Sequence, residues 1–265
     1  MTATTSHHVT VGTARVHYRT AGTGPTLVLV HGTGSGGGEF VWGQLLPYLT
    51  DQFRVVVPDL SGTTSTTDDG APLHIETLAA QVAAVIEAET APGDTVDLIG
   101  FSLGGAIAAA TAALHPDRIA RLVSMASFPR SDHHGFQQTL RLWQSLADDP
   151  QRFGQFAATV AFSPTFLGTL DADTLALLNA GMAPDEGTLR HIDLDLRLDI
   201  RDLLPKITIP TLVVGNAKDA LVPVDLTREL ARAIPGSAYT ELDSGHVSFA
   251  EQPEHALKEV LTFLA

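Results

Sequence analysis

A serine between two glycines is the first feature of this 265-residue chain that could perform chemistry. Residues 100–104 read Gly-Phe-Ser-Leu-Gly, which matches G-x-S-x-G and places Ser102 between an apolar run ending at Ile99 and an alanine-rich helical segment. A serine in such a tight strand-to-helix turn projects its hydroxyl only if the residues two before and two after it have no clashing side chains. The adjacent helix N-terminus would offer N–H groups to a developing oxyanion. The pattern predicts that Ser102 is a nucleophile; the competing interpretation is a glycine-rich turn of a Rossmann-like protein.

A serine hydroxyl is too weak an acid to attack unaided, so it needs a histidine base and a carboxylate that orients the histidine. Of the eleven histidines, His246 follows Gly245 on a late loop after the patterned segment 238–242, where its side chain could reach the serine. The other histidines lie in the N-terminal segment, in an inserted helical block, or where surface and packing roles suffice. His246 is therefore the predicted base.

Two aspartates are candidates for the orienting carboxylate. Asp219 follows the apolar run that ends at Val214, so its side chain would emerge at the same sheet edge as Ser102. Asp132 stands one strand earlier and is the alternative; we predict Asp219. Other acidic residues of the same region are interpreted as a solvated surface, namely Asp193, Asp195, Asp199 and Asp202. No histidine–carboxylate spacing typical of a metal site occurs, so neither a metal nor a cofactor is expected.

A second glycine-rich loop follows the first apolar run. Residues 31–34 read His-Gly-Thr-Gly, and three more glycines follow Ser35. A phosphate-binding loop is the competing interpretation, but the stretch lacks the Gly-Lys-Ser/Thr ending of such loops. We interpret His31 as a residue that orders this loop rather than as a base.

The elements that must position these residues alternate along the chain. Residues 9–18 alternate apolar and polar side chains around Gly12, as an antiparallel hairpin does. Continuous apolar runs typical of strands buried on both faces occupy 26–30, 54–58, 96–99, 119–125 and 210–214. Helical segments between and after them occupy 75–89, 104–114, 224–234 and 253–264. This order predicts an α/β fold with a mostly parallel central sheet and helices on both faces.

The stretch from Phe128 to about Leu204 breaks this alternation because it has helical patterns but no buried-strand run. We predict a helical cap insertion over 128–204, and a core domain formed by 1–127 and 205–265. Residues 192–200 alternate strictly, which by period alone is a strand, but no partner strand is evident. An edge strand and an irregular exit from the cap therefore both stay open.

The cap is rich in aromatic residues that could roof an apolar substrate pocket. Phe136, Trp143 and Phe162 are the predicted substrate contacts. For most of the cap's aromatic residues, packing within the cap itself is the simpler explanation.

Composition excludes several classes of protein. A formal net charge of −14 argues against nucleic acid or an anionic membrane as a partner. The absence of cysteine excludes disulfides, thiolate metal sites and cysteine nucleophiles. No secretory signal pattern and no apolar run of membrane-spanning length occur, so a cytoplasmic protein is expected. The sequence leaves monomer and homodimer open.

These motifs resemble the α/β-hydrolase superfamily of capped bacterial esterases, lactonases, thioesterases, cofactor-free haloperoxidases and elimination enzymes. The resemblance covers nearly the whole chain, with motifs in family order at 31–34, 58–59, 100–105, 115–118, 210–223 and 245–246. It implies a triad in the order Ser102, Asp219, His246, and an oxyanion hole formed by the amides of Thr33 and Leu103. One loop departs: where many relatives read P-D-x-R-G-x-G-x-S, residues 58–65 lack the arginine and the second glycine. The departure leaves the subfamily open.

The resemblance and the site residues together favour metal-independent hydrolysis of an ester, thioester or lactone through an acyl-serine. The expected substrate is a small apolar acyl compound. An eliminating or cyclising lyase of secondary metabolism, using the same triad mainly as a base, is the first alternative. A noncatalytic small-molecule receptor on the same fold is the second.

Overall fold

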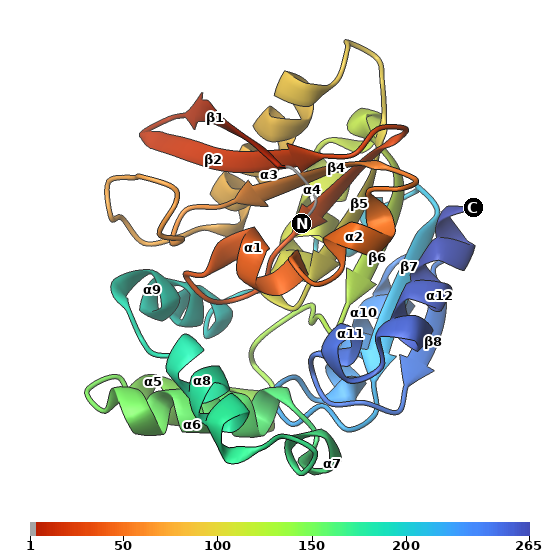
Figure 1. Ribbon diagram of the computed structural model, residues 1–265. Coiled ribbons are helices and arrows are strands. Elements are labelled where there is room, and N and C mark those ends of the chain that lie inside the picture. Colours follow the sequence, from red (N-terminus) through yellow and green to blue (C-terminus); the bar gives the residue numbers. More distant parts are fainter. Residues whose placement is uncertain (1–3) are drawn as a thin grey trace.

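The continuous apolar runs form the centre of a single sheet in the computed structural model, which describes residues 4–265 (Figure 1). Its eight strands are β1 (Thr5–Val11), β2 (Ala14–Ala21), β3 (Thr26–Val30), β4 (Arg54–Asp59), β5 (Val96–Phe101), β6 (Ile119–Met125), β7 (Thr211–Asn216) and β8 (Ala238–Leu242). They lie in the order β1-β2-β4-β3-β5-β6-β7-β8. β1 pairs antiparallel with β2, and β2 with β4, whereas all other pairs are parallel. The predicted hairpin and the mostly parallel sheet are confirmed.

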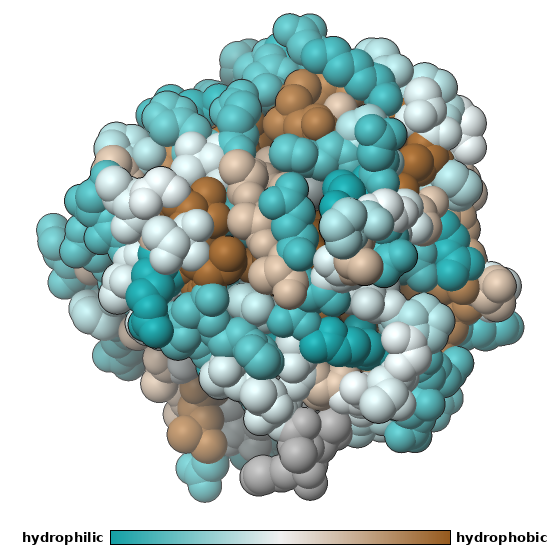
Figure 2. All heavy atoms as spheres, turned by 90° about the horizontal axis from the view of Figure 1, so that it is seen from above, coloured by the Kyte–Doolittle hydropathy of each residue, from teal (hydrophilic) through white to brown (hydrophobic). Residues whose placement is uncertain are grey.

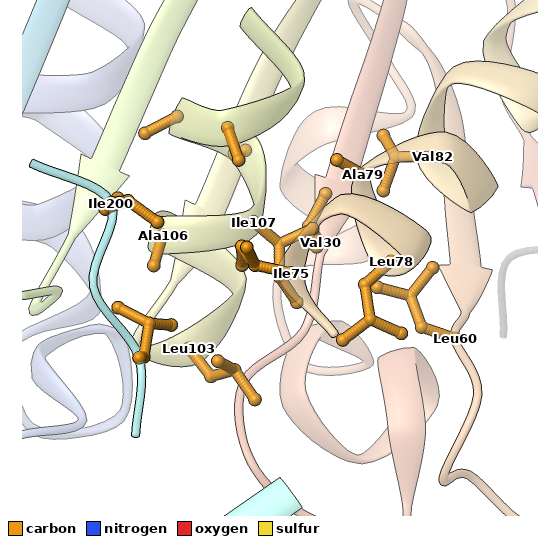
Figure 3. Packing of buried hydrophobic residues seen from close by; sticks show 14 of the residues in the cluster. Val30, Leu60, Ile75, Leu78, Ala79, Val82, Leu103, Ala106, Ile107 and Ile200 are labelled. Carbon is orange, nitrogen blue, oxygen red and sulfur yellow. The ribbon is translucent and has the colours of Figure 1, made fainter. Parts of the chain in front are cut away.

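Helices cover both faces of the sheet because alternate side chains of each central strand point to opposite sides. On one face, Val28 and Val30 of β3 belong to a core that includes α3 (Ile75–Glu89), α4 (Leu103–Leu114) and α10 (Val224–Ala233). Figure 3 shows part of this core, where side chains of α3 and α4 surround Val30. On the other face, Leu27 and Leu29 pack with a second set of helices: α1 (Gly37–Trp42), α2 (Leu46–Leu49), α11 (Ser248–Glu251) and α12 (Pro253–Leu264). Short 3-10 turns stand at Pro116–Arg118 and Leu204–Lys206.

Five further helices lie between β6 and β7, in the region that we call the cap segment, residues 128–204. They are α5 (His134–Ser145), α6 (Pro150–Ala161), α7 (Pro164–Leu167), α8 (Ala172–Gly181) and α9 (Glu186–Asp195), and they lie together beyond one end of the sheet (Figure 1). Side chains cap the first turns of all five by accepting from an amide three residues on: His133, Asp149, Ser163, Asp171 and Asp185.

The strand interpretation of residues 192–200 is wrong. Asp185 caps α9, which continues through Asp195, and the chain then turns away irregularly. A single bridge joins Asp199 to Arg130, and the amide of Ile200 donates to the carbonyl of Pro129 (2.9 Å). The alternating pattern alone did not distinguish a helix from a strand, because the segment is short. Ile192 and Leu194 are buried in the helix, and a strand would bury them equally well.

The face of the molecule away from the cap segment has an ordinary mixed surface. Figure 2 shows it from the top of Figure 1, with small apolar patches separated by hydrophilic residues. Among the helices of residues 4–265, none has both the length and the apolar character needed to cross a membrane.

Candidate active site

Ser102 lies at the sharp turn between β5 and α4, in a backbone conformation that non-glycine residues rarely adopt (φ 57°, ψ −125°). Its amide donates to the carbonyl of Met125 (2.8 Å), which fixes the turn to the neighbouring strand. A Cβ on Gly100 would overlap the carbonyl oxygen of Gly104, and one on Gly104 would overlap the carbonyl oxygen of His31. The two glycines therefore allow the strained turn that presents Ser102.

His246 and Asp219 form a buried pair that follows the carboxyl ends of β8 and β7. His246 Nδ1 lies 2.6 Å from Asp219 Oδ2, and the two side chains are 3% and 1% exposed. The other carboxylate oxygen of Asp219 accepts from the amides of Leu221 (2.9 Å) and Val222 (2.8 Å). Because an ionised carboxylate only accepts hydrogen bonds, Nδ1 carries the hydrogen and Nε2 keeps its lone pair.

Ser102 and His246 line the same cavity, which has a volume of about 250 Å³. The loops after β3 and β5 form one wall, and helices of the cap segment form another. Most of the lining is apolar, and its polar side chains are those of Thr33, Ser35, Gln44, Ser102, Thr188 and His246. Among the described residues of the lining there is no aspartate, glutamate, lysine or arginine. The cavity thus suits an uncharged ligand, because a buried ion would lose its hydration without a partner.

The loop after β3, residues 31–35, approaches Ser102 closely. A Cβ on Gly32 would lie 3.0 Å from the Cβ of Ser102. His31 orders the loop as predicted: Leu60 donates its amide to Nε2 (3.1 Å), so Nδ1 carries the hydrogen that is donated to the carbonyl of Gly32 (2.8 Å). Within residues 4–265, neither the Thr33 amide nor the Leu103 amide donates to a backbone carbonyl. Both amides therefore remain available as hydrogen-bond donors.

The alternative carboxylate, Asp132, does not contact His246. Its side chain is 59% exposed and pairs with Arg130 and with Arg201 (3.5 Å). The guanidinium of Arg130 lowers the pKa of Asp132. Asp132 thus belongs to a surface cluster of ion pairs, and the alternative is wrong.

Two of the three predicted aromatic contacts lie at the cavity. Trp143 and Phe162 line the cavity. Phe136 does not: it is fully buried and packs edge-on against Phe128, with ring centroids 4.7 Å apart. Phe136 and Trp143 share one face of α5, but seven residues separate them along the helix, so only Trp143 reaches the cavity.

Asp195 was expected on a solvated surface, but the structure buries it. Asp195 is 3% exposed, and its Oδ2 accepts a hydrogen bond from the hydroxyl of Thr33 (2.6 Å). Burial raises the pKa of Asp195 to about 7. A helical interpretation of 186–195 would have put Asp195 on the same face as Thr188 and His191, and would have indicated this burial.

Glu251 is a second residue that the sequence interpretation missed. It accepts from the amide (2.6 Å) and hydroxyl (2.7 Å) of Ser163 in the cap segment, and from the amide of Gly245 (3.2 Å). The carboxylate therefore joins the cap segment to the loop that holds His246. Within residues 4–265, no cluster of three or more histidine, aspartate or glutamate side chains has the arrangement of a metal site.

Comparisons with known proteins identify the family of the chain. The family model for the alpha/beta hydrolase fold matches residues 25–253. The chain is 38% identical over 260 residues to a pyrrolizixenacetamide deacetylase from Xenorhabdus hominickii, with 97% of each chain covered. It is 30% identical over 259 residues to a pimeloyl-[acyl-carrier protein] methyl ester esterase from Vibrio vulnificus (strain YJ016), covering 94% of this chain and 97% of the relative.

Among solved structures, the enol-lactonase from Burkholderia xenovorans LB400 superposes with a TM-score of 0.83 at 25% identity, covering 97% of this chain and 99% of that one. The family match extends over most of the chain, and the relatives align from end to end. The chain therefore belongs to the α/β hydrolase family, and it is an enzyme of the serine hydrolase type.

Proposed function

We propose that the enzyme hydrolyses a small, uncharged acyl ester or amide through a covalent acyl-serine. The observation that carries the proposal is that Ser102 and the Asp219-paired His246 line one cavity. A strained serine, a histidine with a defined tautomer and free amides beside them are the parts that acyl transfer uses.

The proposed reaction has two halves. His246 Nε2 takes the proton of the Ser102 hydroxyl while Oγ attacks the carbonyl carbon, and the amides of Thr33 and Leu103 hold the oxyanion. Collapse of this intermediate expels the alcohol or amine, to which His246 returns the proton. A water molecule, deprotonated by His246, then attacks the acyl carbon; the bond to Oγ breaks, His246 returns the proton to Ser102, and the carboxylic acid is released. Asp219 orients His246 and stabilises its protonated form in both halves.

The lining and the volume of the cavity favour a small and uncharged substrate. Trp143, Phe162, Leu178 and Met182 give it an apolar wall, and its volume of about 250 Å³ limits the size of the ligand. One relative is a deacetylase and another a methyl ester esterase, so both remove a small group by hydrolysis. We further propose that residues 128–204 act as a cap that selects the substrate, over a core formed by 1–127 and 205–265.

The proposal is tested with a fluorophosphonate probe and a panel of small acetyl and methyl esters and acetamides. We expect a single adduct, on Ser102, and turnover that disappears in Ser102→Ala. An adduct on another residue of folded enzyme contradicts the nucleophile assignment.

Turnover of the best substrate in ¹⁸O-water then separates hydrolysis from elimination. Hydrolysis through an acyl-serine places the label in the released acid. An unlabelled acid, together with a new double bond in the product, supports an eliminating lyase instead.

A further inference from the structure

One face of the cap helix α9 holds the loop that we assign to the oxyanion hole, residues 32–35. The hydroxyl of Thr33 donates to Asp195 Oδ2 (2.6 Å). The amide of Gly34 donates to His191 Nδ1 (3.2 Å), and the amide of Ser35 donates to the hydroxyl oxygen of Thr188 (3.2 Å). In Figure 1, α9 lies between the other cap helices and the sheet, where it can reach this loop. Three consecutive loop residues are thus held by residues spaced three and four apart, which is the spacing of one helical face.

These contacts restrict the positions of the loop residues, because the three α9 side chains are buried and each accepts one hydrogen bond from the loop. His191 Nδ1 accepts from an amide, so Nε2 must carry the hydrogen, which is donated to the carbonyl of Ser61 (2.9 Å). Burial lowers the pKa of His191 to about 3, which keeps the ring neutral in this role. A Cβ on Gly62 would lie 2.6 Å from His191 Nε2, so the glycine lets the ring sit against this second loop.

We infer that α9 positions the oxyanion hole, with the Thr33–Asp195 hydrogen bond as its principal contact. This inference rests on the proposed acyl-serine function. The Thr33 hydroxyl and the Thr33 amide belong to one residue, so a bond that fixes the side chain also fixes the direction of the N–H. An oxyanion donor is effective only within about 2.7–3.1 Å of the developing charge, and removing one donor lowers kcat by roughly 10²- to 10³-fold. Asp195 is a positioning residue, because it does not line the cavity itself.

The charge of Asp195 matters less to this role than its ability to accept a hydrogen bond. Among the described residues, Asp195 Oδ1 has no hydrogen-bond partner, and the Oδ2 bond comes from an uncharged hydroxyl. Within residues 4–265, no cation offsets a negative charge on this buried group through a hydrogen bond or ion pair. A neutral asparagine that accepts the same bond through its carbonyl oxygen should therefore replace it.

The test compares four variants with the wild type on p-nitrophenyl acetate. Asp195→Leu removes the acceptor, and Asp195→Asn keeps it. Thr33→Val combined with Asp195→Leu replaces both partners by apolar groups, which leaves no buried polar group unpaired. Asp193→Asn is the matched control, because Asp193 lies on the exposed side of the same helix and pairs there with Arg197 (2.9 Å).

We expect Asp195→Leu and the double variant to lower kcat by roughly 10- to 100-fold with little change in KM, less than the loss of a whole oxyanion donor. Asp195→Asn should retain kcat within about threefold of the wild type, because it still accepts from Thr33. The control should match the wild type. Equal impairment of the Asn and Leu variants, or wild-type kcat in the double variant, overturns the inference.

Hydrogen exchange of the loop amides separates this inference from the proposed function. Asp195→Leu and the double variant should exchange faster than the wild type in a peptide spanning 32–36, whereas Asp193→Asn should not. Unchanged exchange overturns the inference whether or not the enzyme cleaves the ester. If these two variants exchange faster but the wild type neither cleaves esters nor reacts with the fluorophosphonate, the proposed function is contradicted, because α9 then holds the loop without serving acyl transfer.

Discussion

Two buried histidine–aspartate pairs in residues 4–265 have similar geometry. His246 Nδ1 lies 2.6 Å from Asp219 Oδ2, and His17 Nδ1 lies 2.8 Å from Asp59 Oδ2. All four side chains are less than a tenth exposed. The first difference is the position relative to the cavity: His246 lines it with Ser102, whereas neither His17 nor Asp59 reaches it.

The second difference is what else each carboxylate binds. Asp59 also accepts from the guanidinium of Arg19 (2.9 Å), which offsets its negative charge. It accepts in addition from the amide of Gly38 (2.7 Å), which fixes the start of α1. Asp219 accepts from backbone amides and from His246 alone within the described chain. A carboxylate without a competing cation is better suited to stabilise a histidine that becomes charged during a reaction. A close histidine–aspartate contact is therefore a weak sign of catalysis until a nucleophile and a cavity accompany it.

Replacing each histidine by alanine gives the largest expected contrast. His246→Ala should lower kcat by roughly 10⁶-fold, since removal of the base from a serine triad has about that effect in a well-studied protease. His17→Ala should leave kcat within about tenfold, because its ring contacts Asp59 and His8 and does not reach the cavity. Steady-state kinetics on the best ester measures both; a His17 variant as inactive as the His246 variant, yet folded, would make the two pairs equivalent.

Neutralising each carboxylate gives the next contrast. Asp219→Asn should lower kcat by roughly 10³- to 10⁴-fold, because the amide favours the wrong histidine tautomer. Asp132→Asn is the control and should leave kcat unchanged, since Asp132 pairs with arginines on the surface. Kinetics together with circular dichroism checks both variants. A sensitive Asp132 and a tolerant Asp219 would reverse the assignment.

The residues of the His246 pair were predictable from sequence because short-range patterns reveal them. Ser102 stands between glycines that the turn requires, Asp219 follows a strand whose apolar pattern is clear, and His246 follows a glycine on a late loop. The predicted helix bounds 75–89 and 253–264 match α3 and α12, since one amphipathic face defines each of them.

The rest depends on contacts between distant parts of the chain. The partner of Asp195 is Thr33, 162 residues away, and no local pattern indicates that contact. Residues 192–195 alternate like a strand but continue a capped helix. The burial of His17 likewise follows from the antiparallel register that sets it opposite Asp59 on β4.

Disrupting the His17–Asp59 pair should change the free energy of unfolding more than kcat. Asp59→Asn leaves the partly buried Arg19 without its carboxylate, so we expect the free energy of unfolding to fall by about 1–3 kcal/mol. Because Asp59 lies outside the cavity, kcat should change by less than about tenfold at temperatures where the variant is folded. Urea unfolding followed by fluorescence measures the first quantity. A normal unfolding midpoint together with a large loss of kcat would place this pair in the reaction.

His191 supplies the smallest and last contrast, because it is a buried histidine whose ring bonds to backbone groups rather than to a carboxylate. Burial, with His31 and Arg190 nearby, lowers its pKa to about 3, against the weaker opposite effect of Asp185 and of the hydrogen bond to Ser61. In the unfolded chain its pKa is about 6.5. The folded state therefore binds fewer protons than the unfolded state between these values, and stability falls as the pH is lowered from about 6.5 toward 3.

At pH 5 this difference corresponds to about 1–2 kcal/mol of lost stability. His191→Gln keeps an amide in place of the ring but does not titrate, so its stability should decline less on acidification than that of the wild type. Asp195 acts in the opposite direction: its pKa is raised to about 7, so its contribution is present at low pH and is lost as the pH rises through about 7. Asp195 and His31 titrate in both proteins, so the difference between the two urea midpoints from pH 7.5 to 4.5 isolates His191. Parallel midpoint curves for wild type and variant would mean that His191 takes up a proton in the folded enzyme as readily as in the unfolded chain, and that the amide of Gly34 does not donate to its ring.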